Sequence, residues 1–200
     1  MGLISNGTTL LDSGALDSGV ATGSLTLIST QTASNSATVS FTSGIDSTYK
    51  EYIFKFINVH PATNSTMFTF QVDTGSNTNY NQTITSCLWN AAHSEADTET
   101  IFGYQTTLDQ SQGTAFQKLA NNTGNENDES LSGTLTIFDP SNTTFTKLFQ
   151  SRVNELHNEN YSFDTYCAGY VNTTTAITRA QFKFASGNID SGTIKLYGVK

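Results

Sequence analysis

Residues 52–57, Tyr-Ile-Phe-Lys-Phe-Ile, and residues 68–72, Phe-Thr-Phe-Gln-Val, decide the fold class. In both segments, aromatic or branched apolar side chains occupy every second position. Successive side chains of a β-strand point to opposite faces of the sheet, so this period of two places the aromatic rings on one face. Thr69 and Gln71 supply a polar second face, which is typical of antiparallel sheets with one side in water. Both segments are therefore predicted to be strands.

The same period of two recurs from Ser24 to the C-terminus. Turn signals separate the segments, among them Ser43-Gly44, Asp139-Pro140 and Ser186-Gly187. No apolar stripe has the helical period of 3.6, so helices are expected to be short turns at most. The sequence predicts an all-β protein, an antiparallel β-sandwich of the jelly-roll type with about eleven strands. Beyond the two segments above, these are residues 24–27, 38–42, 84–89, 115–119, 131–138, 145–153, 163–171, 176–184 and 193–199.

Length and composition favour one domain over residues 24–200, because no Pro- or Gly-rich linker divides the 200 residues. Residues 1–23 differ from the rest: aromatic residues are absent, and Leu11-Asp-Ser-Gly14 is echoed by Leu16-Asp-Ser-Gly19. These residues are interpreted as an extended N-terminal arm. Two alternatives stay open, a frayed tail and a segment that docks on a partner subunit. The docking residues would be the apolar ones, Leu3, Leu10, Leu11, Leu16 and Val20.

Charge and apolar patterning argue against nucleic acid and membranes as partners. The net charge is −8, and the nine basic residues are scattered along the chain, which argues against nucleic-acid binding. Apolar runs are far shorter than the roughly 20 residues of a membrane span, so no membrane contact is expected. No basic segment followed by an apolar one marks a secretory signal after Met1. For Cys87 and Cys167, two buried thiols are favoured over one disulfide.

The best metal-site pattern is His93-Ser-Glu-Ala-Asp-Thr-Glu99. A strand would place Glu95, Asp97 and Glu99 on one face with His93, and three close carboxylates repel one another without a cation. A solvated acidic loop is the favoured alternative, since the stretch holds no large apolar residue. A second acidic segment, residues 121–129, is interpreted as a flexible hairpin tip and lacks the spacing of an EF-hand loop. No cofactor or bound metal is predicted.

The residues argue against an enzyme. No Gly-x-Ser-x-Gly or phosphate-cradling pattern occurs, and Asp139 and Asp164 are interpreted as turn or strand-edge residues rather than as the acids of a glycosidase. No catalytic or cofactor-binding residue is predicted. Aromatic residues near loops or strand ends are candidate glycan contacts, although aromatic residues in strands more often belong to the core. The candidates are Trp89, Tyr104 and Tyr161, with Tyr80 considered beside them.

Five stretches of the sequence carry a resemblance to a protein family. They are Leu27-Ile-Ser-Thr-Gln-Thr-Ala-Ser34, Phe41-Thr-Ser-Gly-Ile-Asp-Ser-Thr-Tyr49, Phe54-Lys-Phe-Ile-Asn-Val-His-Pro-Ala62, Asp139-Pro-Ser-Asn-Thr-Thr-Phe145 and Ser186-Gly-Asn-Ile-Asp-Ser-Gly-Thr-Ile-Lys-Leu-Tyr-Gly198. In these stretches the chain resembles an uncharacterised family of proteins encoded by tailed bacteriophages, particularly marine phages such as those of cyanobacteria. The resemblance spans Leu27 to the C-terminus, and it carries over no catalytic or ligand residue.

The resemblance implies a virion structural protein, either a tail fibre or appendage component or a capsid decoration protein, located in the virion. It implies partners as well: copies of the chain in a homo-oligomer, with a trimer favoured, and other virion proteins. The alternative is a carbohydrate- or host-receptor-binding module of the adsorption apparatus, and a hydrolase of surface polysaccharide stands third. A host surface glycan is therefore a further candidate partner.

Overall fold

A computed structural model describes residues 3–5, 8–12, 15–16 and 24–200 of the chain. The described residues form fifteen strands and no helix, and every hydrogen-bonded strand pair is antiparallel. The prediction of an all-β antiparallel protein is thereby confirmed. Within the same residues, nothing forms an apolar helix of the length that a bilayer crossing requires.

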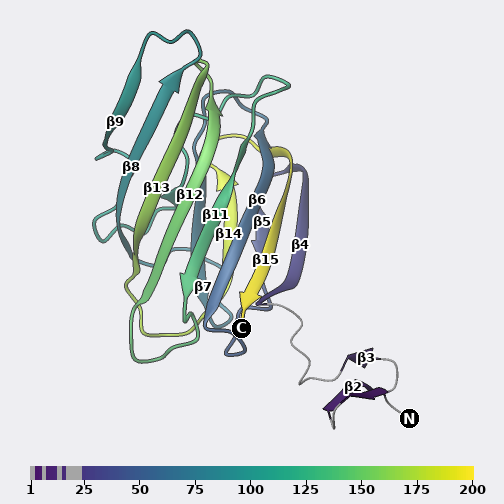
Figure 1. The fold of residues 1–200 in the computed structure, drawn as a ribbon. Helices are drawn as coiled ribbons and strands as arrows, with labels where there is room; N and C mark the ends of the chain where they lie inside the picture. Colours follow the sequence, from purple (N-terminus) through teal and green to yellow (C-terminus); the bar gives the residue numbers. More distant parts are fainter. Residues whose placement is uncertain (1–2, 6–7, 13–14, 17–23) are drawn as a thin grey trace.

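The larger sheet has eight strands and forms one layer of the molecule (Figure 1). Its strands join segments that are far apart in the sequence, since the last strand lies between two of the earliest. In spatial order the strands are β4 (Leu25–Ser36), β15 (Ile189–Val199), β6 (Glu51–Pro61), β11 (Leu131–Phe138), β12 (Lys147–His157), β13 (Tyr161–Val171), β8 (Ile84–Ser94) and β9 (Thr100–Tyr104).

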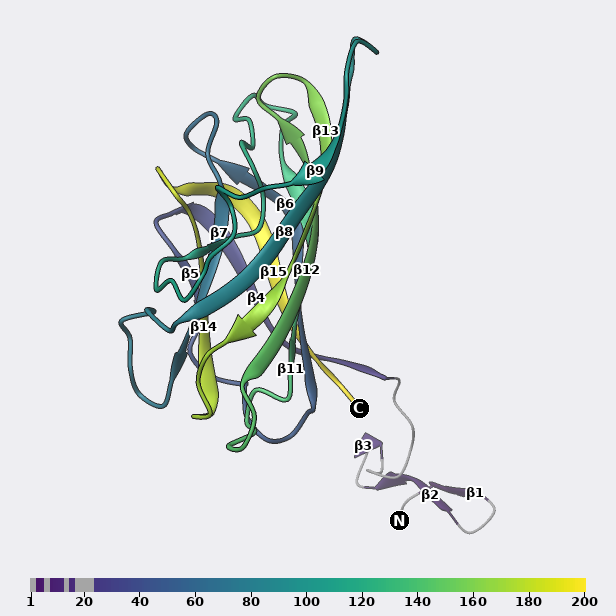
Figure 2. The ribbon, with the colours of Figure 1, turned by 90° about the vertical axis from the view of Figure 1, so that its left-hand side faces the viewer.

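The second layer is a four-stranded sheet that packs against the larger one (Figures 1 and 2). Its strands in spatial order are β10 (Gln117–Lys118), β7 (Phe68–Thr74), β14 (Ile177–Phe184) and β5 (Val39–Phe41). Near the N-terminus, β1 (Leu3–Ser5), β2 (Thr8–Asp12) and β3 (Ala15–Leu16) pair with one another in a separate three-stranded sheet. Residues 24–200 therefore form a β-sandwich of two unequal sheets.

The core lies between the two sheets and is built from phenylalanine rings. Phe54 and Phe56 project from β6, and both are almost fully buried. The ring of Phe182 on β14 lies 5.0 Å from that of Phe54 and 5.3 Å from that of Phe56, with edge-to-face geometry. Phe68 on β7 lies 5.1 Å from Phe56. The alternation at residues 52–57 thus places one face of β6 against the second sheet, and these contacts hold the two layers together.

Several strands extend beyond the apolar pattern that predicted them. β12 continues to His157 because its inward positions after Val153 are the buried polar residues Glu155 and His157, which a search for apolar alternation does not detect. β9, at the edge of the larger sheet, was not predicted. The strand expected at residues 115–119 is reduced to the two residues of β10, Gln117 and Lys118.

Most of the expected docking residues of the N-terminal arm fall in β1–β3, and for them the backbone alone is described. Leu3 lies in β1, Leu10 and Leu11 in β2, and Leu16 in β3. Val20 lies outside the described residues. Leu11 pairs with both Leu3 and Leu16 across the small sheet. The interpretation of residues 1–23 as a docking arm stays a prediction.

Candidate functional site

The candidate site is the outward face of the larger sheet, the side that points away from the four-stranded sheet. Alternation along β12 separates the two faces: Phe149 and Val153 are buried in the core, whereas Leu148 and Arg152 point outward and are exposed. Leu148 keeps 57% of its surface accessible. An exposed apolar residue by itself is common, whereas a contiguous apolar patch marks an interaction site, so the neighbours of Leu148 and Arg152 decide what this face can do.

Strand register brings aromatic residues from three strands into line with Arg152. Arg152 on β12 lies opposite Tyr166 on β13, Tyr166 lies opposite Trp89 on β8, and Trp89 lies opposite Tyr104 on β9. Phe102, two positions from Tyr104 on β9, completes what we call the aromatic row. These five residues come from four neighbouring strands. Trp89 and Arg152 are 63 positions apart in the sequence, and the strand order of the sheet brings them close together.

Three rings of the aromatic row contact one another, from Phe102 through Trp89 to Tyr166. The rings of Trp89 and Tyr166 are nearly parallel, with centroids 4.0 Å apart and an interplanar angle of 8°. The Phe102 ring lies 5.3 Å from that of Trp89 on the β9 side. On the β12 side, the guanidinium carbon of Arg152 lies 4.9 Å from the centre of the Tyr166 ring, in a cation–π contact. Tyr166 is thus covered on both faces.

Asp164 fixes the end of the aromatic row. Its carboxylate accepts hydrogen bonds from Nε of Arg152 at 3.0 Å and from Nη2 at 2.6 Å, the paired geometry that suits a guanidinium. The Tyr166 hydroxyl donates to the same carboxylate at 3.2 Å. The bonds to Asp164 raise the pKa of Arg152 above its ordinary value, while partial burial and then the Asp164 charge raise the pKa of Tyr166. Arg152 therefore stays charged and is held in one orientation.

A groove of about 320 Å³ lies beside the aromatic row. Trp89, Tyr166 and Arg152 line it together with the hydroxyl and amide groups of Thr134, Thr136 and Gln150. Farther along the same strands, an apolar depression of about 490 Å³ is lined by Phe138, Leu148 and Tyr170, among others. Gln150, Cys87 and Ala168 line both hollows. The two hollows therefore adjoin, the first with a mixed lining and the second with a mainly apolar one.

The two cysteines lie on opposite faces of the larger sheet. Cys87 is exposed and lines the groove, whereas Cys167 points into the core and is buried. Cys87 pairs in register with Ala168, so the two thiols project in opposite directions and are free. Burial raises the pKa of the Cys167 thiol. The expectation of two buried thiols is correct for Cys167 and wrong for Cys87, because the outward face is not covered by the second sheet.

The three predicted glycan contacts separate into two places. Trp89 and Tyr104 face each other in the aromatic row, and 54% of Tyr104 is exposed. The Tyr104 hydroxyl donates to Asp109, and this bond raises the pKa of Tyr104 to about 12. Tyr161 lies near the start of β13, where its hydroxyl donates to Glu99 at 2.8 Å and its ring packs near Phe163. The sequence search missed Tyr166, Arg152 and Phe102, because their proximity depends on the strand order.

The predicted acidic residues lie at the connection between β8 and β9. Glu95, Asp97 and Glu99 are exposed there, and the Asp97 carboxylate accepts a hydrogen bond from Nε2 of the His93 ring at 3.1 Å. Residues 95–99 follow the end of β8 and are not in a strand, so the alternation that would align the carboxylates is missing. Among the residues that the structure describes, no group of three metal-ligating side chains comes together.

The second acidic segment, residues 121–129, joins β10 to β11, which lie in different sheets, so its interpretation as a hairpin tip is wrong; residues 126–128 are exposed and the others are buried or half-buried. Thr123 and Glu129 are buried, and Glu129 accepts a hydrogen bond from the amide of Glu126 at 2.5 Å. The carboxylate of Glu155, buried on the inward side of β12, accepts from the Thr123 hydroxyl and from the amide of Asn121 at 2.6 Å. Loss of solvent raises the pKa of Glu155 to about 7. Glu155 thus fastens this segment over the end of the sandwich.

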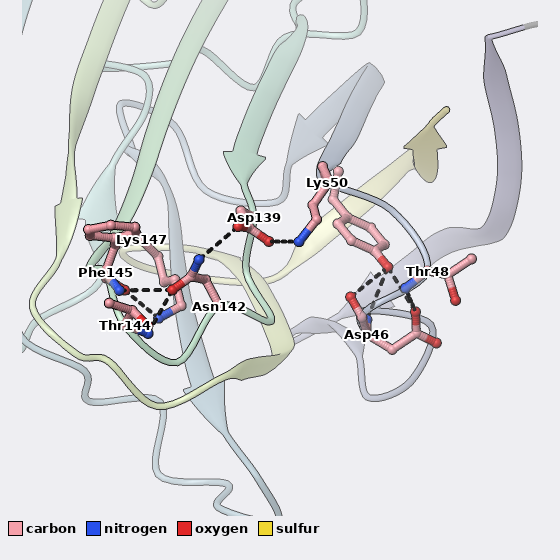
Figure 3. Close-up of polar contacts among 9 residues, drawn as sticks. Asp46, Thr48, Lys50, Asp139, Asn142, Thr144, Phe145 and Lys147 are labelled. Carbon is pink, nitrogen blue, oxygen red and sulfur yellow. Dashed lines mark hydrogen bonds and ion pairs between the residues drawn. The ribbon is translucent and has the colours of Figure 1, made fainter.

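Asp139 belongs to a turn network at the opposite end of the sheet (Figure 3). Its carboxylate binds Nζ of Lys50 at 3.0 Å and accepts from the Asn142 amide at 2.9 Å, and these bonds, the one from Asn142 foremost, lower the pKa of Asp139. Nζ of Lys147 donates to the carbonyls of Phe145 and Thr173. Each polar group here holds the connection after β11 in place, as expected for a turn residue.

Comparison with known proteins gives no match: no protein-family model, no curated protein and no solved structure is similar to this chain.

Proposed function

We propose that this chain is a non-catalytic structural protein of a phage virion, a subunit of a tail fibre or appendage or of a capsid decoration, that assembles through the outward face of its larger sheet. The aromatic row supports the assembly surface, and the resemblance of residues 27–200 to tailed-phage proteins supports the place in a virion. Trp, Tyr and Arg are the residues that contribute most to protein–protein binding, and they act from the centre of an interface. Because Trp89, Tyr166 and Arg152 already hold one another in place, little side-chain freedom is left to lose on docking.

We further assign the sandwich to the jelly-roll type. The route of the chain supports this: from β4 to β8 each successive strand crosses to the other sheet, and the chain crosses again to β14 and back to β15. Such repeated crossing is what winds a jelly roll. The division into eight and four strands is more unequal than in the usual eight-stranded form, because β11, β12 and β13 follow one another within the larger sheet.

The proposed partners are copies of the chain, as a ring or trimer, and other virion proteins. The acidic composition is compatible with a protein partner and unfavourable for nucleic acid. The arm of residues 1–23 would add contacts through Leu3, Leu10, Leu11, Leu16 and Val20. Deleting residues 1–23 tests the arm by itself: assembly and incorporation into particles should both decrease, and unchanged incorporation would refute the role of the arm.

Incorporation into particles tests the outward face. A Trp89→Ala, Tyr166→Ala variant should keep the fold but be lost from purified particles, as measured by its copy number in quantitative mass spectrometry. Phe145→Ala is the control, because Phe145 is an exposed aromatic residue, 69% accessible, that lies away from the aromatic row in the connection between β11 and β12. Equal copy numbers for the double variant and the control would contradict the proposal.

The alternative, a carbohydrate- or host-receptor-binding module, is favoured by one observation. Thr134, Thr136 and Gln150 offer hydrogen-bonding groups beside Trp89, as a sugar site requires. Sugars stack on open ring faces, however, and the faces of Tyr166 and Trp89 are covered by their neighbours. Titration of the intact chain with host envelope polysaccharide separates the two functions: a glycan binder loses its ligand in Trp89→Ala and keeps its oligomeric state.

A further inference from the structure

A row of basic residues continues the aromatic row across the rest of the outward face. Arg152 lies opposite Thr134 on β11, Thr134 lies opposite Lys55 on β6, and Lys55 lies opposite Lys195 on β15. We call Arg152, Lys55 and Lys195 the basic row. The chain has nine basic residues and a net charge of −8, so this row gathers a third of its basic residues on one line; Arg152 is paired with Asp164, and the two lysines carry the free charge. Such a concentration is not expected from a composition this acidic.

Lys55 and Lys195 face each other directly across two paired strands. Like charges in this arrangement destabilise a sheet. The ion pairs of the described residues involve Lys50, His60, His93 and Arg152, so neither lysine has a carboxylate within 4.0 Å. Nζ of Lys55 lies 5.3 Å from the centre of the Tyr197 ring, which positions it without neutralising it. The pair is therefore arranged to meet a negative group from outside this copy of the chain.

A matching negative group projects from the same chain. The connection between β8 and β9 extends past the ends of the neighbouring strands (Figures 1 and 2). It carries Glu95, Asp97 and Glu99, all exposed, and the side chain of Asp97 is 91% accessible. We call these three residues the acidic tip. It shares the outer end of the sheet with β9, whereas Lys195 lies six strands away on β15.

We infer that the acidic tip of one copy docks on the basic row of the next copy, and that this head-to-tail contact joins the subunits. The inference deepens the proposed function and rests on it. A contact between two different surfaces of the same chain is heterologous, and it closes into a ring when the rotation between copies divides a full turn. The aromatic row is continuous with the basic row at Arg152, so a neighbouring subunit seated on the basic row lies beside the aromatic row.

The charges and the aromatic row have separate roles in this contact. Exposed ion pairs each contribute little affinity, typically about 0–1 kcal/mol, but complementary charges select the partner and the orientation. The stacked rings provide the apolar surface that is removed from water. The assembly should therefore weaken with added salt, and it should depend on the charges for its specificity and on Trp89 and Tyr166 for its strength.

A charge swap tests the contact on the full chain. Lys55→Glu, Lys195→Glu and, separately, Glu95→Lys, Asp97→Lys should each weaken association by about tenfold or more in sedimentation or mass photometry. The combination of all four substitutions should restore it, because the charges again match. Lys118→Glu, Lys183→Glu is the matched control: both lysines lie on the four-stranded sheet, and the net charge changes by the same amount.

Four outcomes overturn the inference, and the last of them leaves the proposed function standing. In the first, the wild-type chain stays monomeric. In the second, each pair of substitutions alone dissociates the oligomer, and the variant with all four substitutions stays dissociated as well. The third is an unchanged oligomer in Lys55→Glu, Lys195→Glu together with lost binding to a uronate polysaccharide, which would assign the basic row to an acidic glycan. If the swaps leave association unchanged while Trp89→Ala, Tyr166→Ala is still lost from particles, the inference fails and the proposed function stands.

Discussion

Two aromatic clusters lie on opposite sides of the larger sheet, and they differ in what covers them. The inner cluster consists of phenylalanines around Phe182, whose ring contacts Phe41, Phe54, Phe56 and Phe68 from both sheets. The outer cluster is the aromatic row. Its members Trp89, Tyr166 and Arg152 carry polar groups, an indole N–H, a hydroxyl and a guanidinium, in addition to their apolar surface. The same alternation along strands produces both clusters. The second sheet, rather than the strand pattern, therefore decides which cluster is core.

The largest effect should follow from breaking the inner cluster. Phe182→Ala removes a fully buried ring from the middle of the core, and such a cavity typically lowers the free energy of unfolding by about 3–5 kcal/mol. Phe102→Ala removes an equal ring from the outer cluster, where 78% of the side chain is exposed, so its effect should be much smaller. Urea unfolding of both variants measures the difference, and equal losses would refute the assignment of core and surface.

The two faces of β12 should also differ in how their charges respond to pH. Glu155 on the inward face has its pKa raised from 4.5 to about 7, so the folded state binds this proton more tightly than the unfolded state. Its contribution to stability is complete below pH 4.5 and is lost as pH rises to about 7. At 1.36 kcal/mol per pKa unit the loss is about 3 kcal/mol.

Unfolding by urea between pH 4.5 and 7.5 checks this sign. Burial lowers the pKa of the neighbouring His157, which acts in the opposite direction, so the wild type must be compared with Glu155→Gln rather than read alone. The variant, which cannot ionise, should lack the decrease in stability that the wild type shows. Asp164→Asn on the outward face is the control and should leave the decrease in place. Parallel pH curves for wild type and Glu155→Gln would contradict the account.

A smaller effect is expected when the outer cluster is broken. Trp89→Ala removes the stack on Tyr166 and should lower the free energy of unfolding by about 1 kcal/mol, the usual contribution of an aromatic pair. Its effect on assembly should be larger than its effect on stability. The free energy of unfolding and the oligomeric state of Trp89→Ala are to be measured on one preparation. A loss of stability close to that of Phe182→Ala would show that the aromatic row is part of the core.

The sequence predicted the strands where apolar residues alternate and failed where polar residues occupy inward positions. Residues 52–57 and 68–72 lie in β6 and β7 as expected, but the polar face expected at Thr69 and Gln71 is buried rather than in water. Glu155 and His157 point inward but are polar, so the apolar pattern did not predict the end of β12. It also did not predict that residues 121–129 pack on Glu155. Buried polar groups leave no apolar period, so their burial depends on partners such as Thr123 that only the fold brings near.

The candidate site was predictable in part. Trp89 and Tyr104 could be singled out as aromatic residues near strand ends, but Tyr166 and Arg152 come from strands far along the chain and join them only through the order β12, β13, β8, β9. The same holds for the basic row, since Lys55 and Lys195 become neighbours when the last strand inserts beside β6. Scattered charges in a sequence therefore do not exclude a charged row on a sheet.

Labelling of Cys87 tests most directly whether the outward face is an assembly surface. Cys87 is exposed in the groove beside the aromatic row, while Cys167 is buried behind the same sheet and serves as an internal reference. A maleimide should modify Cys87 rapidly in dissociated subunits and about tenfold or more slowly in the assembled oligomer, and Cys167 only after unfolding. Equal rates for Cys87 in subunits and oligomers would show that this face stays open, and would contradict the account.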